Sequence, residues 1–463
     1  MIALTKGPTV IHLLRRLALP CLLALGTLAA TPAEAVIRID ITGGSVQPLP
    51  IAIPEFVASN PQATPDGALQ TLSTRISQVL SDDLKNSGLF RPLDKAAFTT
   101  TVTAENFATP DYASWRTIAA QALVTGYAKL NADGSMAVGC YLFDVFSEEG
   151  LLQHSVTIAT PKQWRRAAHK CADKIYTQLT GDSGYFDTRI AYIAETGPRK
   201  NRVKRLAIMD QDGANIEYLT TGQNLALTPR FAPDGGSLSY LAFGATPRVF
   251  RYDLTTRRQE LLGRFPNMSF APRYAPDGRS IALTLSENGD SDIYILDLAS
   301  KQTRRITNQP SIDTSPSFSP DGQRIVFESN RGGSQQLYVM NADGSGAQRI
   351  SFDTANPRAR YGSPVWSPRG DLIAFTKIAN GKLRIGVMRP DGSGERLLTD
   401  SWQDEAPAWS PNGRVITFFR TQRSTARTDG GVAVHAIDLT GVNERRIPTP
   451  TDSSDPNWSP LLP

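Results

Sequence analysis

The chain contains few of the residues that ligate metals or act as nucleophiles. Among its 463 residues there are 3 cysteines and 4 histidines. The histidines beyond the N-terminal segment (His154, His169 and His435) show no metal-ligand spacing. The sequence also has no phosphate-binding loop, no dinucleotide fingerprint after a strand and no nucleophile elbow. We therefore expect no metal, no cofactor, no catalytic residue and no enzymatic activity.

An excess of charge of one sign is also missing. The chain has 49 basic and 44 acidic side chains, which gives a formal net charge of +5. A nucleic-acid-binding protein concentrates basic residues on one face, and no such concentration is visible here. Beyond residue 35 no apolar run is long enough to span a bilayer. The sequence predicts no nucleic-acid partner and no membrane-spanning segment in the mature chain.

The first 35 residues have the composition of an export signal. Lys6, Arg15 and Arg16 precede the apolar run 17–30, and Ala33-Glu34-Ala35 supplies a small-x-small cleavage pattern. A permanent anchor is disfavoured because this run is shorter than the roughly 20 residues of a spanning helix. Residues 1–35 are therefore predicted to be a signal peptide that is removed.

Two cysteines, Cys140 and Cys171, remain after that removal. An exported protein enters a compartment that permits disulfides. Cys171 falls on the apolar face of a predicted helix, together with Trp164, Ala168 and Ile175. Two buried free thiols are the favoured interpretation, and a disulfide between the two cysteines is the alternative.

One motif recurs six times in the second half of the chain. Each copy has an aromatic residue between two prolines, and five copies continue into a turn that ends in glycine. The second prolines stand 43 to 49 residues apart, which is typical of propeller blades. The copies are TPRFAPDG from Thr228, APRYAPDG from Ala271, SPSFSPDG from Ser315, SPVWSPRG from Ser363, APAWSPNG from Ala406 and DPNWSP from Asp455.

The motif predicts a turn followed by a strand. Proline presets φ, Asp or Asn bonds its own backbone, and glycine accepts a positive φ, so the chain reverses or bends sharply. Apolar residues then follow with a period of two, as at Ile325 and Phe327, which indicates a strand with one buried face. Two further strands complete each repeat as a four-stranded antiparallel sheet, and such sheets bury one another when stacked radially.

The two ends of this region complement each other. The sixth motif stops three residues after Pro460, whereas residues 189–221 contain strand-like runs with no motif before them. We expect the C-terminal strand to complete the first blade. The predicted fold class is an all-β six-bladed β-propeller over residues 185–463, with a smaller N-terminal α/β domain over residues 36–184.

The N-terminal domain shows a different pattern. Strands are predicted at 36–41, 50–56, 122–130, 138–145 and 155–159, and helices at 67–87 and 163–179. Gly88 is expected to cap the first helix. Residues 181–184 form a predicted linker, and their sequence, Gly-Asp-Ser-Gly, imitates a serine-protease nucleophile without a plausible acid partner for any histidine.

Repeated residues of the blades have competing interpretations. The motif aromatics could stack on carbohydrate, but a residue repeated at one place in every blade more often fills the core between blades. They are Phe231, Tyr274, Phe318, Trp366, Trp409 and Trp458. The Asp-Gly turns at Asp212, Asp343 and Asp391 lack the ligand count of a calcium loop and are predicted to be hairpin turns.

Four short blocks accompany the blades in a fixed order. They are VIRIDI at 36–41, DLKNSG at 83–88, KQWRR at 162–166 and FDTRIAY at 186–192. Together with the export signal and the six motifs, they resemble the TolB family of the Tol-Pal system. The resemblance covers the whole mature chain.

The resemblance implies a function and two binding sites. A TolB-like protein is a periplasmic, non-enzymatic monomer that links the inner-membrane TolA complex to the peptidoglycan-associated lipoprotein Pal. It maintains outer-membrane integrity and outer-membrane constriction during cell division, and other outer-membrane or peptidoglycan-associated proteins are further partners that the resemblance allows. Carried over to this chain, the positions that face Pal are Met268, Ala271, Thr314 and Ser315. The segment that binds TolA is 36–47, beginning with Val36, Ile37, Arg38, Ile39, Asp40 and Ile41.

Two functions from other classes remain as alternatives. A secreted propeller hydrolase or lyase would need acid, base or metal-binding residues that converge at the mouth of the channel. A glycan-binding propeller would bind purified peptidoglycan without any lipoprotein.

Overall fold

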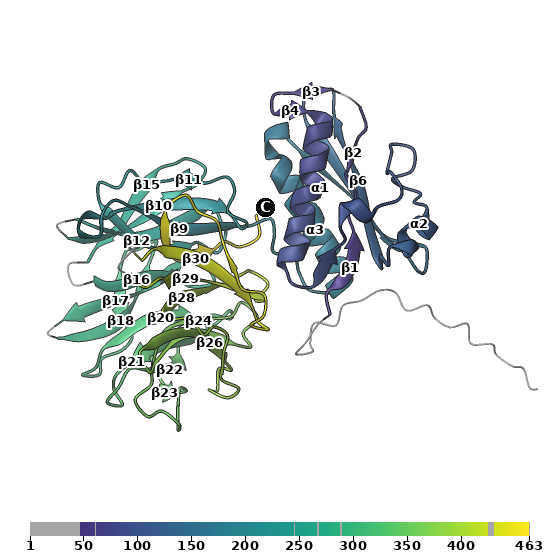
Figure 1. The fold of residues 1–463 in the computed structure, drawn as a ribbon. Helices are drawn as coiled ribbons and strands as arrows, with labels where there is room; N and C mark the ends of the chain where they lie inside the picture. Colours follow the sequence, from purple (N-terminus) through teal and green to yellow (C-terminus); the bar gives the residue numbers. More distant parts are fainter. Residues whose placement is uncertain are drawn as a thin grey trace, which may run out of the picture. The chain divides into compact units, whose positions relative to one another are not determined.

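The computed structural model describes residues 47–462, except residues 61, 245, 266–267, 288 and 425–429, and except the side chains of residues 199 and 268–271. The predicted signal peptide and residues 36–46 of the predicted TolA-binding segment lie outside the described residues. The chain is shown as a ribbon in Figure 1.

The N-terminal part is built on a mixed sheet. Its strand order is β5-β1-β6-β7-β8, and β2 pairs with β6 beside β1. The pairs β1/β5, β1/β6 and β2/β6 are parallel, whereas β6, β7 and β8 run antiparallel. The strands are β1 (Leu49–Ala52), β2 (Val57–Ala58), β5 (Phe90–Pro92), β6 (Ala122–Leu130), β7 (Met136–Asp144) and β8 (Glu149–Ile158), with a separate hairpin of β3 (Ala63–Thr64) and β4 (Gly67–Ala68).

Helices α1 (Leu69–Asn86) and α3 (Trp164–Thr180) cover one face of this sheet, side by side in Figure 1. The apolar residues of α1 recur at helical spacing, and six of them are buried: Leu69, Leu72, Ile76, Val79, Leu80 and Leu84. Gly88 follows α1 with φ +75°, the left-handed conformation that glycine adopts without strain. The two predicted helices and the capping glycine are therefore confirmed.

The opposite face of the sheet has its own small core. Trp115, from the short helix α2 (Tyr112–Thr117), packs there with Leu123 of β6 and Phe143 of β7. Helix α2 and strand β5 were not predicted, and the strand predicted at 50–56 corresponds to β1, which is shorter at its C-terminal end. That strand ends at Ala52 because Pro54 has no N–H to continue the ladder. Strand β8 begins at Glu149, six residues before the predicted start.

Six four-stranded antiparallel sheets form the rest of the described chain. In the order inner to outer edge, the first sheet comprises β32 (Asp452–Trp458), β9 (Arg189–Thr196), β10 (Val203–Asp210) and β11 (Glu217–Tyr218). The second comprises β12 (Leu225–Phe231), β13 (Ser237–Phe243), β14 (Pro247–Asp253) and β15 (Gln259–Arg264). The third comprises β16 (Met268–Tyr274), β17 (Ser280–Glu287), β18 (Asp290–Asp297) and β19 (Thr303–Arg305).

The remaining three sheets repeat this order. The fourth comprises β20 (Asp313–Phe318), β21 (Arg324–Ser329), β22 (Gln336–Asn341) and β23 (Gln348–Arg349). The fifth comprises β24 (Arg360–Trp366), β25 (Ile373–Ala379), β26 (Lys382–Met388) and β27 (Arg396–Leu397). The sixth comprises β28 (Asp404–Trp409), β29 (Val415–Thr421), β30 (Val432–Asp438) and β31 (Arg445–Arg446). Single turns η1 (Lys95–Ala97), η2 (Pro161–Gln163) and η3 (Arg199–Asn201) lie between elements.

The C-terminal strand closes the ring, as predicted. Strand β32 pairs antiparallel with β9, and Trp458 lies opposite Ile190. Trp458 Nε1 donates a hydrogen bond to Thr188 Oγ1 at 2.7 Å. The first blade thus combines the first and the last strands of the propeller sequence. Because β32 pairs with β9, the inner edge of β9 is not left unpaired.

A bulge interrupts the inner strand of every blade at the first motif proline. The register shifts across Pro229, Pro272, Pro316, Pro364, Pro407 and Pro456. Proline cannot donate to the ladder, so it occupies the unpaired position of a bulge. The preceding residue has a positive φ in five blades: Thr228, Ser315, Ser363, Ala406 and Asp455. Positive φ is uncommon outside glycine, so these five residues mark a strained ring that recurs around the propeller axis.

The motif aromatics fill the core between blades. Phe231, Trp366, Trp409 and Trp458 are buried, and each belongs to a different hydrophobic cluster. Tyr274 and Phe318 pack against two further clusters. This placement supports the core interpretation over a row of exposed carbohydrate platforms.

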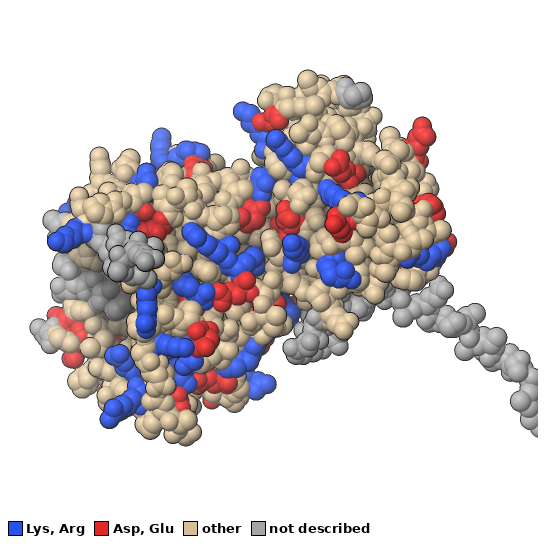
Figure 2. All heavy atoms as spheres, in the orientation of Figure 1, with Lys and Arg blue, Asp and Glu red and all other residues tan. Residues whose placement is uncertain are grey.

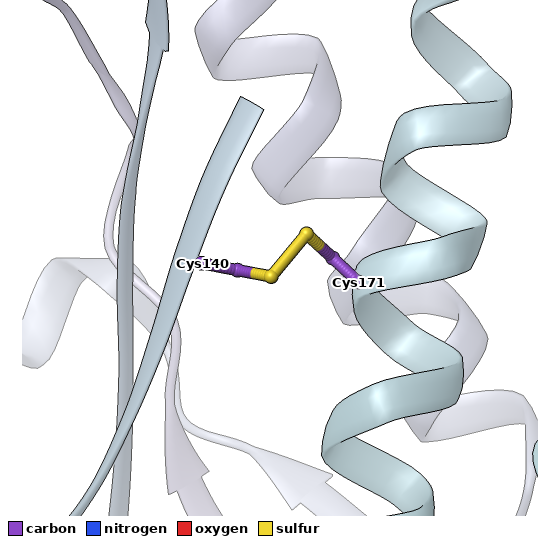
Figure 3. The surroundings of a disulfide bond; sticks show 2 residues. All are labelled: Cys140 and Cys171. Atoms are coloured by element: carbon purple, nitrogen blue, oxygen red, sulfur yellow. A yellow bond between two sulfur atoms is a disulfide. The ribbon is translucent and has the colours of Figure 1, made fainter. Parts of the chain in front are cut away.

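Cys140 and Cys171 form a disulfide, so the favoured interpretation of two free thiols was wrong. Cys140 lies on β7 and Cys171 on α3, with their Cα atoms 6.2 Å apart (Figure 3). This separation is within the usual range for a bridge. The bond joins the sheet to the helix that packs on it, and both residues are fully buried.

Candidate functional site

Two cavities lie along the axis of the propeller, and they share Arg230 and Arg273. We call the first, of about 320 Å³, the bulge-side cavity. It is lined by Thr228, Ser315, Ser363, Ala406 and Asp455 of the strained ring, with Arg230, Arg273, Glu328, Gln335, Gly362, Thr376, Ile378, Leu383, Glu405 and Phe419. We call the second, of about 430 Å³, the proline-side cavity; it is lined by the second motif prolines, the motif aromatics and their neighbours.

The four positions expected to face Pal belong to the inner strands of the third and fourth blades. Ser315 lines the bulge-side cavity with φ +53°. Thr314, next to it, is 3% exposed, so its side chain offers little surface to a partner. Met268 and Ala271 lie on the backbone of β16, and their side chains are outside the described residues. Because β16 and β20 are neighbouring inner strands, the backbone brings all four positions to one sector of the ring.

Glu328 organises this sector. Its Oε1 accepts the backbone N–H of Ser363 at 2.5 Å, and its Oε2 accepts Gln335 Nε2 at 2.5 Å. Thr314 Oγ1 approaches the same Oε2 at 3.4 Å. One carboxylate from β21 therefore connects the inner strands β20 and β24 of adjacent blades, which holds the bulges in fixed positions.

The charges of the bulge-side cavity are only partly paired. Burial raises the pKa of Asp455, and the charge of Arg230 opposes that rise. Burial also raises the pKa of Glu405, whose Oε1 accepts Gln403 Nε2 at 2.6 Å. The two arginines of this cavity thus come from adjacent blades and its three carboxylates from other blades, a pattern that suits a polar partner surface with complementary charges.

A second cluster of titratable groups joins α1, α3 and β10. His169, Asp210 and Asp212 offer ligand atoms within 4.8 Å of one another, although their sequence spacing did not indicate a site. Arg165 forms an ion pair with Asp212 and lies 3.5 Å from Asp210 Oδ2. Because a guanidinium already compensates both carboxylates, we interpret the cluster as a structural ion-pair network.

The displayed surface carries a mixture of charges. Figure 2 shows Lys and Arg interspersed with Asp and Glu over the visible face. Among the described helices, none is long and apolar enough to cross a membrane.

Comparisons with known proteins identify the family. A model described as the TolB amino-terminal domain matches residues 37–151, and one described as the TolB beta propeller domain matches residues 176–462. The Tol-Pal system protein TolB of Rhizorhabdus wittichii is 53% identical over 97% of this chain and 99% of its own length. The chain belongs to the TolB family.

Other TolB proteins support the same conclusion. The Tol-Pal system protein TolB of Paramagnetospirillum magneticum is 54% identical over 95% of this chain and 96% of its own length. That of Zymomonas mobilis is 52% identical over 92% of this chain and 91% of its own length. A crystal structure of TolB from Acinetobacter baumannii superposes with a TM-score of 0.75 at 27% identity, covering 92% of this chain and all of that one.

Several residues of the TolB channel were not singled out from the sequence. Asp455 opens the sixth motif, and Arg230 and Arg273 occupy the same motif position in the second and third blades, so the repeat carried a signal for them. Glu328 lies on the second strand of its blade, outside the motif, and no local pattern points to it.

Proposed function

We propose that this TolB protein is a periplasmic, non-enzymatic interaction component of the Tol-Pal system that binds Pal at the bulge-side cavity and TolA through residues 36–47. Linking the two partners would couple the inner membrane to the peptidoglycan layer. By the same coupling the protein would serve outer-membrane integrity and constriction during division. We also propose that the N-terminal domain, residues 36–184, contains the TolA-binding segment and that the propeller, residues 185–463, contains the Pal-binding site.

One observation carries the Pal assignment. The ring of bulges presents five residues with positive φ around the bulge-side cavity, and Ser315, a candidate from the family resemblance, is one of them. Strained backbone persists where the surrounding structure enforces it, and such positions cluster at binding sites. The Glu328 hydrogen bonds supply that enforcement in this sector.

A substitution at the mouth tests the Pal site. Ser315→Arg places a long charged side chain at the bulge-side cavity, and we expect it to weaken binding of purified Pal by at least about tenfold in calorimetry, because a steric and electrostatic clash is introduced. Thr255→Arg is the matched control, since Thr255 is exposed on the outer turn between β14 and β15. Equal Pal affinity for both variants and the wild type would refute the proposed site.

The TolA segment is tested by deletion. Removing residues 36–47 should abolish binding of purified TolA and leave the Pal site physically present. Pal titration of the same truncated protein is the control for folding. If the truncated protein still bound TolA at full strength, the assignment of this segment would be wrong.

A further inference from the structure

The position between the first proline and the aromatic of each motif forms a second ring along the channel. Its members are Arg230, Arg273, Ser317, Val365, Ala408 and Asn457, and all six line the proline-side cavity. Four are small or uncharged, whereas the two from adjacent blades are arginines. The channel therefore has a strongly asymmetric charge at this level.

Arg273 lacks a counter-charge. Within the described part of the chain it makes no hydrogen bond and no ion pair, and the charge that acts on it is that of Arg230. Burial lowers the pKa of Arg273 well below its ordinary value, and the neighbouring guanidinium adds to this effect. Two like charges side by side in a partly buried channel disfavour each other unless an anion lies between them.

Arg230 is also incompletely paired. Its Nη1 donates to the carbonyl oxygen of Pro229 at 2.7 Å, and its buried Nε has no hydrogen-bond partner among the described residues. Asp455 acts on Arg230 electrostatically from the bulge-side cavity. The proline-side cavity has no Asp or Glu among its described lining residues, and the carboxylates that share a cavity with the two arginines line the bulge-side cavity instead.

The remaining walls of this cavity combine aromatic and proline rings with five serines and Asn457. Trp366, Trp409 and Trp458 contribute part of their ring surfaces, and the six second motif prolines form a rim. A cavity of about 430 Å³ is within the range that holds small molecules. Guanidinium groups recognise carboxylates by paired N–H donors, and the aromatic and proline rings favour a ligand with an apolar body.

We propose that the proline-side cavity is a binding site for a small carboxylate with an apolar body, held by Arg230 and Arg273. The bulge-side cavity shares these two arginines, but the proposed ligand lies in the proline-side cavity and its binding does not require Pal or TolA. The carboxylate would neutralise the paired arginines, and the aromatic and proline side chains would cover the rest of the ligand.

Benzoate and benzamide test the proposal, because they have the same shape and differ in charge. In calorimetry with the full mature chain, benzoate should bind saturably at one site and benzamide at least about tenfold more weakly. Arg273→Ser and Arg230→Ser each replace an arginine by serine, the residue found at the same motif position in the fourth blade (Ser317). Each substitution should weaken benzoate binding by roughly tenfold to a hundredfold. Arg273→Lys should retain part of the affinity, and Arg279→Ser, at an exposed position of the same blade, should retain all of it.

Chemical modification gives a test that needs no variant. Phenylglyoxal modifies arginine, and benzoate should slow its reaction at Arg273 and Arg230 but not at Arg279, as measured by peptide mass mapping of the wild type. The proposal is overturned if benzoate shows no saturable binding, if benzamide binds equally well, or if folded Arg273→Ser binds benzoate like the wild type. Equal modification of all three arginines with and without benzoate would overturn it as well.

Discussion

His169 Nδ1 lies 2.6 Å from Asp83 Oδ2, and both side chains are almost completely buried. The contact joins helix α3 to helix α1. Gln211, directly after β10, extends it by donating from Nε2 to Asp83 Oδ1 at 2.7 Å. A buried charged group of this kind is stable only when it is paired, so the three elements depend on one another at this point.

The pKa values of His169 and Asp83 are both raised above those of the free side chains. Burial alone would lower the pKa of His169, but the charge and the hydrogen bond of Asp83 outweigh burial and raise this pKa to about 9. Burial raises the pKa of Asp83 as well. Both shifts favour the protonated pair in the folded state, so the direction of the pH effect is the same for both groups.

We therefore expect the free energy of unfolding to fall as the pH rises from about 6.5 to about 9. The contribution of His169 is fully present below its unfolded pKa of about 6.5 and is lost as the pH passes its folded value. Urea unfolding at a series of pH values measures this dependence of the free energy of unfolding on pH. His169→Gln should cost roughly 3–5 kcal/mol at pH 6 and should flatten the profile above pH 6.5.

His154→Gln is the matched control for this profile. Burial and the nearby charges of Lys174 and Lys170 lower the pKa of His154, so this histidine loses its proton at lower pH than His169 does. Its replacement should leave the slope in that range unchanged. A wild-type profile that is flat there, or one that rises, would contradict the assignment to His169.

The Cys140–Cys171 disulfide should contribute measurably to stability. It closes a loop of 31 residues, and a bridge of this loop size stabilises a fold by about 2–4 kcal/mol, mainly through the unfolded chain. Replacing both cysteines by alanine should lower the free energy of unfolding by that amount. Dithiothreitol should destabilise the wild type similarly and leave the double variant unchanged, whereas equal wild-type stability with and without the reductant would exclude a stabilising bridge.

The strained ring predicts different outcomes for two substitutions at one residue. Ser363 has φ +51°, which costs a non-glycine residue roughly 1–2 kcal/mol. Ser363→Gly removes that strain but adds backbone entropy to the unfolded chain, so its effect on stability should lie within about 1 kcal/mol of zero. Ser363→Val places a branched Cβ in the left-handed region and should destabilise by about 1–3 kcal/mol in urea unfolding. Equal stabilities for the two variants would mean that the backbone is not strained at this bulge.

The propeller could be predicted from the sequence because its signals are local and repeated. Each Pro-Asp-Gly turn acts within a few residues, and six copies at regular spacing determine the blade number. Closure by the C-terminal strand followed from one unfinished motif and one blade without a motif. The helices at 69–86 and 164–180 were predictable for the same reason, since their apolar residues recur at helical spacing.

The missed features depend on contacts between distant residues. Asp83, His169 and Gln211 come together only after α1, α3 and β10 have packed, and no pattern in the sequence relates their positions. The disulfide required the knowledge that α3 lies over β7. The arginines of the channel were visible as deviations from the repeat, but their lack of counter-charges appears only when the six inner strands surround one cavity.

Ring closure by Trp458 provides the most direct test of the architecture. Its indole is 5% exposed, packs edge-on against Tyr185 with ring centroids 5.8 Å apart, and donates its N–H to Thr188. Trp458→Ala removes this packing from the strand that joins the last residues to the first blade, and we expect a loss of about 3–5 kcal/mol in the free energy of unfolding. Trp402→Ala is the control, because Trp402 is 40% exposed and should cost less than about 1.5 kcal/mol. If both variants lost the same small amount, β32 could not be the strand that holds the ring closed.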